Sequence, residues 1–68
     1  MNKLCIATAI FPAYRAVHIY NGADFVTLNT GDVFVLVGRP NGGMHNILFN
    51  GALLFIHDYY RSFCCEGL

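Results

Sequence analysis

Short apolar runs and turn residues alternate along the whole chain. The runs are rich in Val, Ile, Phe, Tyr, Thr and Leu, and only residues 53–65 offer ten or more residues of helical period without Gly or Pro. This spacing is typical of short strands joined by hairpins. The turn signals are Pro12, Asn21-Gly22, residues 29–32, residues 39–43 and Asn50-Gly51.

The two Asn-Gly pairs are the strongest hairpin signals, because both central residues of a type I′ turn take a positive φ. Residues 53–65 follow the second pair, and their aromatic and β-branched content favours a strand, one short turn near residues 58–60 and a further strand. The expected strands span residues 3–11, 15–20, 24–28, 33–38, 45–50, 52–57 and 61–65.

The segment from residue 33 to 37 is apolar at every position, without the alternation of a half-exposed strand. Such a strand is expected to be covered on both faces. The interior of a barrel covers one face, and the other needs a loop, a neighbouring segment or a partner. Val35 and Ile56 lie in the middle of uncharged runs and are therefore predicted to be in the core.

Length and composition predict one small all-β domain over residues 1–68. The chain is 56% hydrophobic, and its four basic and four acidic residues give a formal net charge of zero. A domain of this size buries only about 60% of the surface that its unfolded chain exposes. Its apolar surface is therefore expected to be covered in part by another protein or by a second copy, as in a homo-oligomer.

From residue 9 onward the layout resembles a Src-homology-3 domain. Such domains open with an Ala-Leu-Tyr-Asp-Tyr strand, continue through a long hairpin loop to Gly-Asp and a second strand, and close after a tight distal hairpin. The matching segments are Ala9 to Tyr14, residues 14–30, Gly31-Asp32, Asn50-Gly51 and residues 51–61. The resemblance implies a small β-barrel of about five to six antiparallel strands, with one short 3₁₀ turn at residues 58–60.

The resemblance also bears on the binding surface. In the family, a proline-rich peptide lies on Tyr, Trp, Pro and Tyr side chains flanked by loop carboxylates. Tyr60 matches the last of these positions, and Phe11 or Tyr14 matches the first. The chain has no Trp, His57 stands where the proline would be, and Asp24 is the single acid of the long loop. These departures indicate a barrel with a different binding surface.

Charge and cysteine usage exclude several partners and compartments. The four cations Lys3, Arg15, Arg39 and Arg61 are scattered singly, whereas nucleic-acid binding rests on clustered Lys and Arg, so no nucleic-acid partner is expected. No apolar stretch approaches the roughly 20 residues that span a bilayer, and residues 4–11 are interpreted as a buried strand rather than a signal peptide. The odd cysteine count favours a reducing, cytoplasmic location.

The residues that could carry chemistry are His57, Asp58, Cys64 and Cys65. Zinc sites need a spacing such as Cys-x-x-Cys, and two adjacent cysteines of a strand point to opposite faces. A chain this short has little room for a substrate cleft of even about 300 Å³. We therefore expect no catalytic residue, no metal and no cofactor, and we expect Cys5 and one of the adjacent cysteines to be small core residues.

More aromatic side chains are present than one small core can hold, and Tyr and Arg often anchor protein interfaces. The sequence therefore predicts a stand-alone module that binds a larger protein, in the manner of a compact accessory protein encoded by a bacteriophage. Inhibition of that protein is one form of this hypothesis. A self-associating assembly subunit is the alternative, and a nucleic-acid-binding barrel is disfavoured by the charge balance. The predicted binding residues are Tyr14, Arg15, Tyr20, Arg39, Tyr59, Tyr60 and Arg61.

Overall fold

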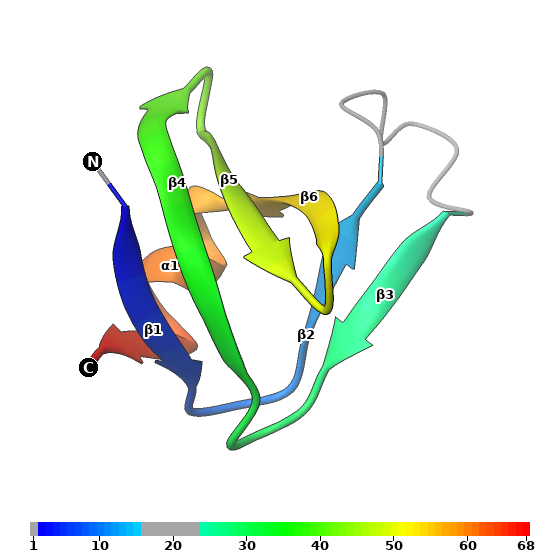
Figure 1. Cartoon of the computed structure of the whole chain (residues 1–68), viewed down its shortest axis with the longest axis vertical. Coiled ribbons are helices and arrows are strands. Elements are labelled where there is room, and N and C mark those ends of the chain that lie inside the picture. Colours follow the sequence, from blue (N-terminus) through cyan, green and yellow to red (C-terminus); the bar gives the residue numbers. More distant parts are fainter. Residues whose placement is uncertain (1, 16–23) are drawn as a thin grey trace.

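The computed structural model describes residues 2–15 and 24–68, which form one strongly curled sheet and one short helix (Figure 1). Seven antiparallel strands make an open half-barrel, in the order β3-β2-β6-β5-β4-β1-β7. The elements are β1 (Lys3–Ala7), β2 (Phe11–Tyr14), β3 (Phe25–Leu28), β4 (Val33–Asn41), β5 (Met44–Phe49), β6 (Ala52–His57), α1 (Asp58–Phe63) and β7 (Cys65–Gly67). The expected all-β class is confirmed, with seven strands instead of five to six.

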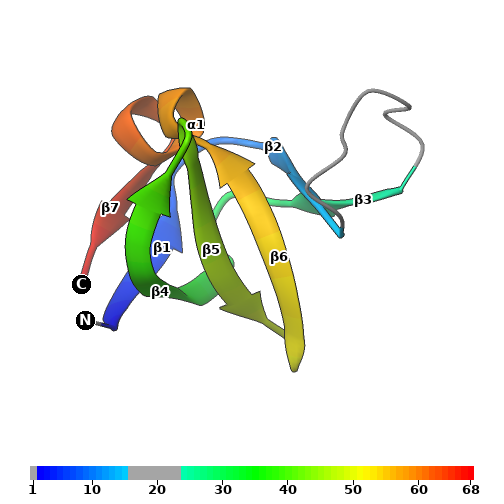
Figure 2. The same ribbon diagram turned by 90° about the horizontal axis from the view of Figure 1, so that it is seen from above.

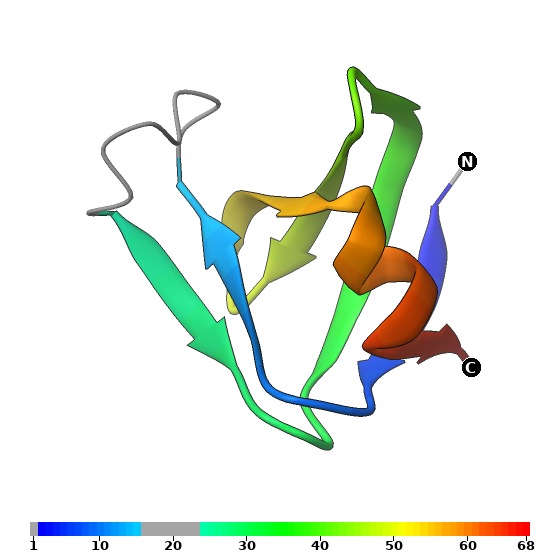
Figure 3. The same cartoon turned by 180° about the vertical axis from the view of Figure 1, so that it is seen from behind.

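The sheet is built around the meander β4-β5-β6, whose strands pair with their sequence neighbours. β1 pairs with β4 on one side and with β7 on the other, so the two ends of the chain lie side by side (Figure 2). The β2–β3 hairpin joins the far edge, where Tyr14 of β2 pairs with Phe55 of β6. Figure 3 shows α1 on the concave side of the sheet, between the end of β6 and the start of β7.

The core fills the concave side of the sheet. Phe11 and Phe34 meet edge to face, with ring centroids 6.2 Å apart, and Ile56 is fully buried as predicted. Burying aromatic and branched side chains is the main stabilising contribution available to so short a chain. The buried residues are Cys5, Ala7, Phe11, Ala13, Leu28, Phe34, Leu36, Ile47, Leu54, Ile56 and Cys65.

The prediction for Val35 was wrong. Phe34 and Leu36 of β4 point inward, so Val33, Val35 and Val37 point to the outer face of the sheet, since neighbouring side chains of a strand alternate. Val33 is 45% exposed. The strand lacks an apolar–polar alternation because its outer face is apolar too, although no segment among the described residues covers that face.

The predicted first strand, residues 3–11, is two strands. β1 ends at Ala7, whose N–H donates to the Asp32 carbonyl at 2.8 Å and whose carbonyl accepts the Gly31 N–H at 2.8 Å. After this point the chain crosses from β4 to the opposite edge and begins β2 at Phe11. Pro12 lies within β2 and does not end a strand, because β2 pairs with β6 only at Tyr14 and the missing N–H disturbs no bond there.

One of the two predicted Asn-Gly hairpins lies within the described residues. Asn50-Gly51 joins β5 and β6, and the φ angles of +51° and +77° at these residues are those of a type I′ turn, so this hairpin is confirmed. Asn21-Gly22 lies outside the described residues, as does the predicted strand 15–20 except for its first residue. Arg15 is not part of a strand, and its N–H donates to the Asp24 carbonyl at 3.1 Å.

The C-terminal prediction was wrong in its details. The expected 3₁₀ turn at residues 58–60 is a six-residue α-helix that extends to Phe63, and the last strand begins at Cys65 rather than at residue 61. Tyr59 and Phe63 are four residues apart and their rings are 5.0 Å apart, a pairing that stabilises a helix. Over the part of the chain that the structure describes, no helix is both long and apolar enough to cross a bilayer.

Candidate functional site

A continuous series of ring contacts crosses the surface from the β2–β3 hairpin to α1. Tyr14 lies 6.1 Å from Phe25 and 6.0 Å from His57, measured between ring centroids. His57 lies 6.1 Å from Tyr60, which in turn lies 5.6 Å from Tyr59. We call this set the aromatic strip; its members are Phe25, Tyr14, His57, Tyr60, Tyr59 and Phe63.

Strand register and helix periodicity assemble the strip. Tyr14 and Phe25 are directly paired across the β2–β3 hairpin, and side chains at such positions lie within contact distance. His57 is the last residue of β6, so the strip passes without interruption into α1. Tyr59 and Phe63, four residues apart, then occupy one side of the helix.

The strip combines anchored and free side chains. Tyr60 stacks on the buried ring of Phe11, with centroids 5.6 Å apart and planes inclined by 15°, so it is held against the core. Phe25, Tyr59 and Phe63 are 47%, 63% and 71% exposed. Exposed aromatic rings of this kind are common in protein interfaces.

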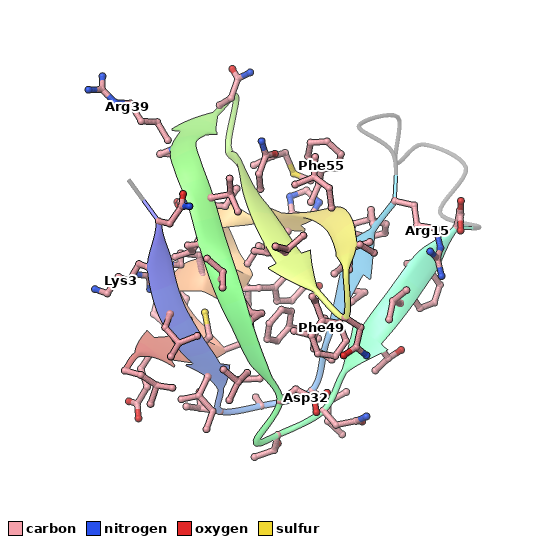
Figure 4. All side chains as sticks on the ribbon, in the orientation of Figure 1. Lys3, Arg15, Asp32, Arg39, Phe49 and Phe55 are labelled. Carbon is pink, nitrogen blue, oxygen red and sulfur yellow. The ribbon has the colours of Figure 1, made fainter. Side chains whose placement is uncertain are left out.

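One ion pair flanks the strip at the β2–β3 end. The Arg15 Nε atom lies 2.9 Å from Asp24 Oδ1, and both side chains are largely exposed, with Arg15 beside β3 in Figure 4. An exposed pair of this kind contributes little to stability. It leaves this end of the strip polar and locally neutral.

The structure brings together only part of the predicted binding set. Tyr14, Tyr59 and Tyr60 belong to the strip, and Arg15 lies at its end. Arg39 projects from the β4 end of the β4–β5 hairpin (Figure 4), and Arg61 lines a cavity beside β1 and β4. Tyr20 lies outside the described residues. The aromatic and arginine residues therefore do not form one common patch within the described residues.

Sequence reasoning left three members of the strip out of the binding set. Phe25 is an outward residue of a short strand, and its pairing with Tyr14 depends on a register that the sequence does not specify. Phe63 was assigned to a strand, although its spacing of four from Tyr59 is helical. His57 was considered as a substitute for proline and as a metal ligand, but its contacts are with the rings of Tyr14 and Tyr60.

A second apolar feature lies on the outer face of the half-barrel. Four strands contribute one residue each to a straight row, because Leu4 pairs with Val35, Val35 with Leu48, and Leu48 with Leu53. The three leucines are each exposed to roughly half of their full extent. We call this the outer apolar row; it consists of Leu4, Val35, Leu48 and Leu53.

The cysteines behave as packing residues. Cys5 and Cys65 are buried, as was expected of Cys5 and one of the adjacent pair. Burial raises the pKa of the Cys65 thiol, and the nearby Arg61 guanidinium opposes this effect only in part. The Cys65 Sγ donates to the carbonyls of Tyr60 and Arg61, at 3.6 and 3.5 Å. Within residues 2–15 and 24–68, no three His, Cys, Asp or Glu side chains come together as metal ligands do.

Comparison with the models of known protein families, with curated proteins and with solved structures gave no match to this chain. Its function must therefore be inferred from its own geometry, in which the aromatic strip and the outer apolar row are two apolar features of the described surface.

Proposed function

We propose that this chain is a non-catalytic protein-interaction module and that the aromatic strip is the surface on which its partner docks. The observation that carries the proposal is the continuity of the strip, from Phe25 on β3 to Phe63 on α1. Aromatic side chains bury much apolar area and lose few rotamers on binding, so they contribute more to interface energy than most residues do.

The proposed finer fold is a Src-homology-3-like barrel. It is supported by the order of the elements: a long hairpin after the first strand, a meander with a tight turn at Asn50-Gly51, and a helical turn before the last strand. In that alignment Tyr14 and Tyr60 occupy positions of the family's peptide groove, with His57 between them. The strip follows the same path, which supports a peptide or protein as the ligand.

The composition of the strip favours an apolar protein surface as the partner rather than a polyproline helix. The chain has no Trp, and His57 occupies the position of the family's proline. The flanking Arg15–Asp24 pair is neutral as a unit, so it offers no field for a charged ligand. A module of this size would act by covering a site on a larger cytoplasmic protein, which is how it would inhibit that protein.

The test is the affinity of a partner captured from the native host. The informative variant is Tyr59→Ala with Phe63→Ala, because both rings are exposed and their loss leaves the core intact. Ile10→Ala is the matched control, since Ile10 is 66% exposed but forms no part of the strip. Each exposed ring is expected to contribute about 1–2 kcal/mol, so the double variant should bind at least tenfold more weakly. Unchanged affinity in the folded double variant would refute the proposal.

Replacing Tyr60 together with Arg61, two of the binding residues predicted from the sequence, is a poorer test. Tyr60 stacks on Phe11 and packs against the core, so its truncation is expected to lower stability as well as binding. A loss of binding in that variant would not separate the two effects.

Self-association is the second candidate, and the outer apolar row favours it. The row is continuous across four strands and contains no charged residue, so two copies could meet there without charge repulsion. A stable interface of standard size covers about 800 Å² on each copy. Sedimentation equilibrium of the wild type and of Leu48→Glu separates the cases: a dimer that Leu48→Glu dissociates supports self-association, and a monomeric wild type excludes it.

A further inference from the structure

A cavity of about 400 Å³ opens between β1, β4, β5 and α1. It is separate from the aromatic strip and shares no residue with it. The lining consists of Asn2, Lys3, Leu36, Gly38, Pro40, His45 and Arg61. Its volume falls within the range of about 300–1,000 Å³ that is usual for sites of small ligands. The expectation that so short a chain has little room for a cleft of even about 300 Å³ was therefore wrong.

The end of β4 shapes this cavity. The pairing of β4 with β5 shifts register between Val37 and Asn41, and Gly38 lies in this irregular stretch with a φ of +71°. A residue with a side chain would be strained at that angle, and a Cβ atom on Gly38 would meet nothing within 4 Å, so the space beside it is open. The buried Leu36 and the exposed Pro40 form apolar walls of the cavity.

The charge around the cavity is uneven. The chain has only four Lys and Arg residues, and two of them, Lys3 and Arg61, line this one cavity. No Asp or Glu is among the lining residues. By contrast, Arg15 is paired with Asp24. Among the described residues, Lys3 and Arg61 form no ion pair. The end of the Lys3 side chain lies beside Gly67 of β7, and the Arg61 guanidinium lies near the Cys65 thiol.

His45 completes the polar side of the lining. Its side chain is only 11% exposed, and its Nε2 atom lies 2.7 Å from Asp58 Oδ1. Asp58 itself is largely exposed and is anchored by its N–H, which donates to the Gly43 carbonyl at 2.9 Å. This contact fixes the imidazole ring at the cavity wall. The same contact occupies one oxygen atom of the Asp58 carboxylate.

We propose that this cavity binds a carboxylate group, held chiefly by Arg61, with Lys3 as a second cation of the lining. The planar guanidinium matches a carboxylate with two parallel N–H···O bonds. The apolar walls at Leu36 and Pro40 suit the carbon atoms that carry the carboxylate, whereas a phosphate is usually held by more converging donors than this lining supplies. The carboxylate comes either from an acidic side chain of a protein or from a small free organic acid.

The experiment is a titration followed through the backbone amide signals of Gly38 and His45 in ¹⁵N-labelled protein. Four probes are added in turn: succinate, the peptide acetyl-Ala-Glu-Ala-amide, its Gln counterpart and inorganic phosphate. The variants are Arg61→Gln and Lys3→Gln, with Arg39→Gln as the matched control because Arg39 is exposed and does not line the cavity. The melting temperature of each variant shows whether it is folded.

We expect saturable shifts with succinate or with the Glu peptide and none with the Gln peptide. Loss of a charge-assisted pair should weaken binding about tenfold in Arg61→Gln, and less in Lys3→Gln, while Arg39→Gln stays unchanged. Tighter binding of succinate identifies a free acid as the source, and tighter binding of the Glu peptide identifies a protein side chain. The proposal is overturned if neither carboxylate saturates, if phosphate binds more tightly than both, or if Arg39→Gln weakens binding as much as Arg61→Gln does.

This site stands apart from the proposed function, and its test is separable from the partner test. The Tyr59→Ala, Phe63→Ala variant should retain full affinity for the carboxylate probes. If that variant lost carboxylate binding while remaining folded, the cavity would not be the independent site that we propose.

Discussion

Replacing Ile56 by Ala removes a side chain that is fully buried in the concave face of the sheet. The truncation deletes about three methylene equivalents at about 0.8 kcal/mol each, and the cavity that remains adds to this loss, for a total of about 3–4 kcal/mol. A chain of 68 residues is expected to have a free energy of unfolding of only about 3–10 kcal/mol. Ile56→Ala should therefore be severely destabilised, with a measurable unfolded fraction at room temperature.

Val35→Ala is the matched comparison, because Val35 lies mid-strand in the same meander but points outward and is only partly buried. Its truncation should lower the free energy of unfolding by about 1 kcal/mol or less. Urea unfolding followed by circular dichroism measures both variants against the wild type. Equal losses, or a larger loss for Val35→Ala, would show that the strand faces are assigned wrongly. The placement of Tyr14 and His57 in the strip would then also be wrong.

Three further predictions concern the turn, the helix and the buried thiol. Gly51→Ala should lower the free energy of unfolding by about 1 kcal/mol, measured in urea, because the φ of +77° is strained for alanine. Tyr60→Ala should lower it by about 2 kcal/mol through the loss of stacking on Phe11, whereas Tyr60→Phe should keep nearly all of the wild-type stability; equal losses would exclude the stacking. For Cys65, whose pKa is raised above the ordinary 9.0, stability should fall as pH rises past that value, because the unfolded thiol ionises before the folded one. Urea midpoints at about pH 8 and about pH 10 should show a fall that is smaller in Cys65→Ala, and an identical fall in both proteins would contradict the prediction.

The all-β class and the main hairpin could be predicted from the sequence because they depend on local signals. The type I′ turn at Asn50-Gly51 needs only the φ preferences of these two residues. Ile56 was placed in the core because it lies in the middle of an uncharged run, and β6 buries it together with Leu54. In both cases the information lies within a few residues.

The errors arose where one local pattern fits two structures. Residues 61–63 are helical, although aromatic and β-branched content favoured a strand, because the Tyr59–Phe63 contact and the Cys64 N–H bond to the Tyr60 carbonyl at 2.8 Å stabilise and end a helix. Val35 was assigned to the core because a strand apolar on both faces does not reveal which face is inside.

The residue types of the candidate site could be predicted from the sequence, but their arrangement could not. Tyr14, Tyr59 and Tyr60 were recognised as interface residues by type, but their meeting through His57 depends on the register of β2 against β6, which a single Tyr14–Phe55 pair reports. Lys3 and Arg61 line the same cavity only because the two ends of the chain lie side by side. Neither relation is expressed by spacing along the chain.

The most direct test of the proposed function is a map of the surface that the partner covers. Saturation transferred from an unlabelled, captured partner to the labelled chain lowers the signals of the residues in contact. We expect the ring signals of Phe25, Tyr59 and Phe63 to lose the most intensity, while the signals of Ile10 and Leu48 are unaffected. Losses centred on Leu48 and the rest of the outer apolar row, with the strip unaffected, would contradict this expectation.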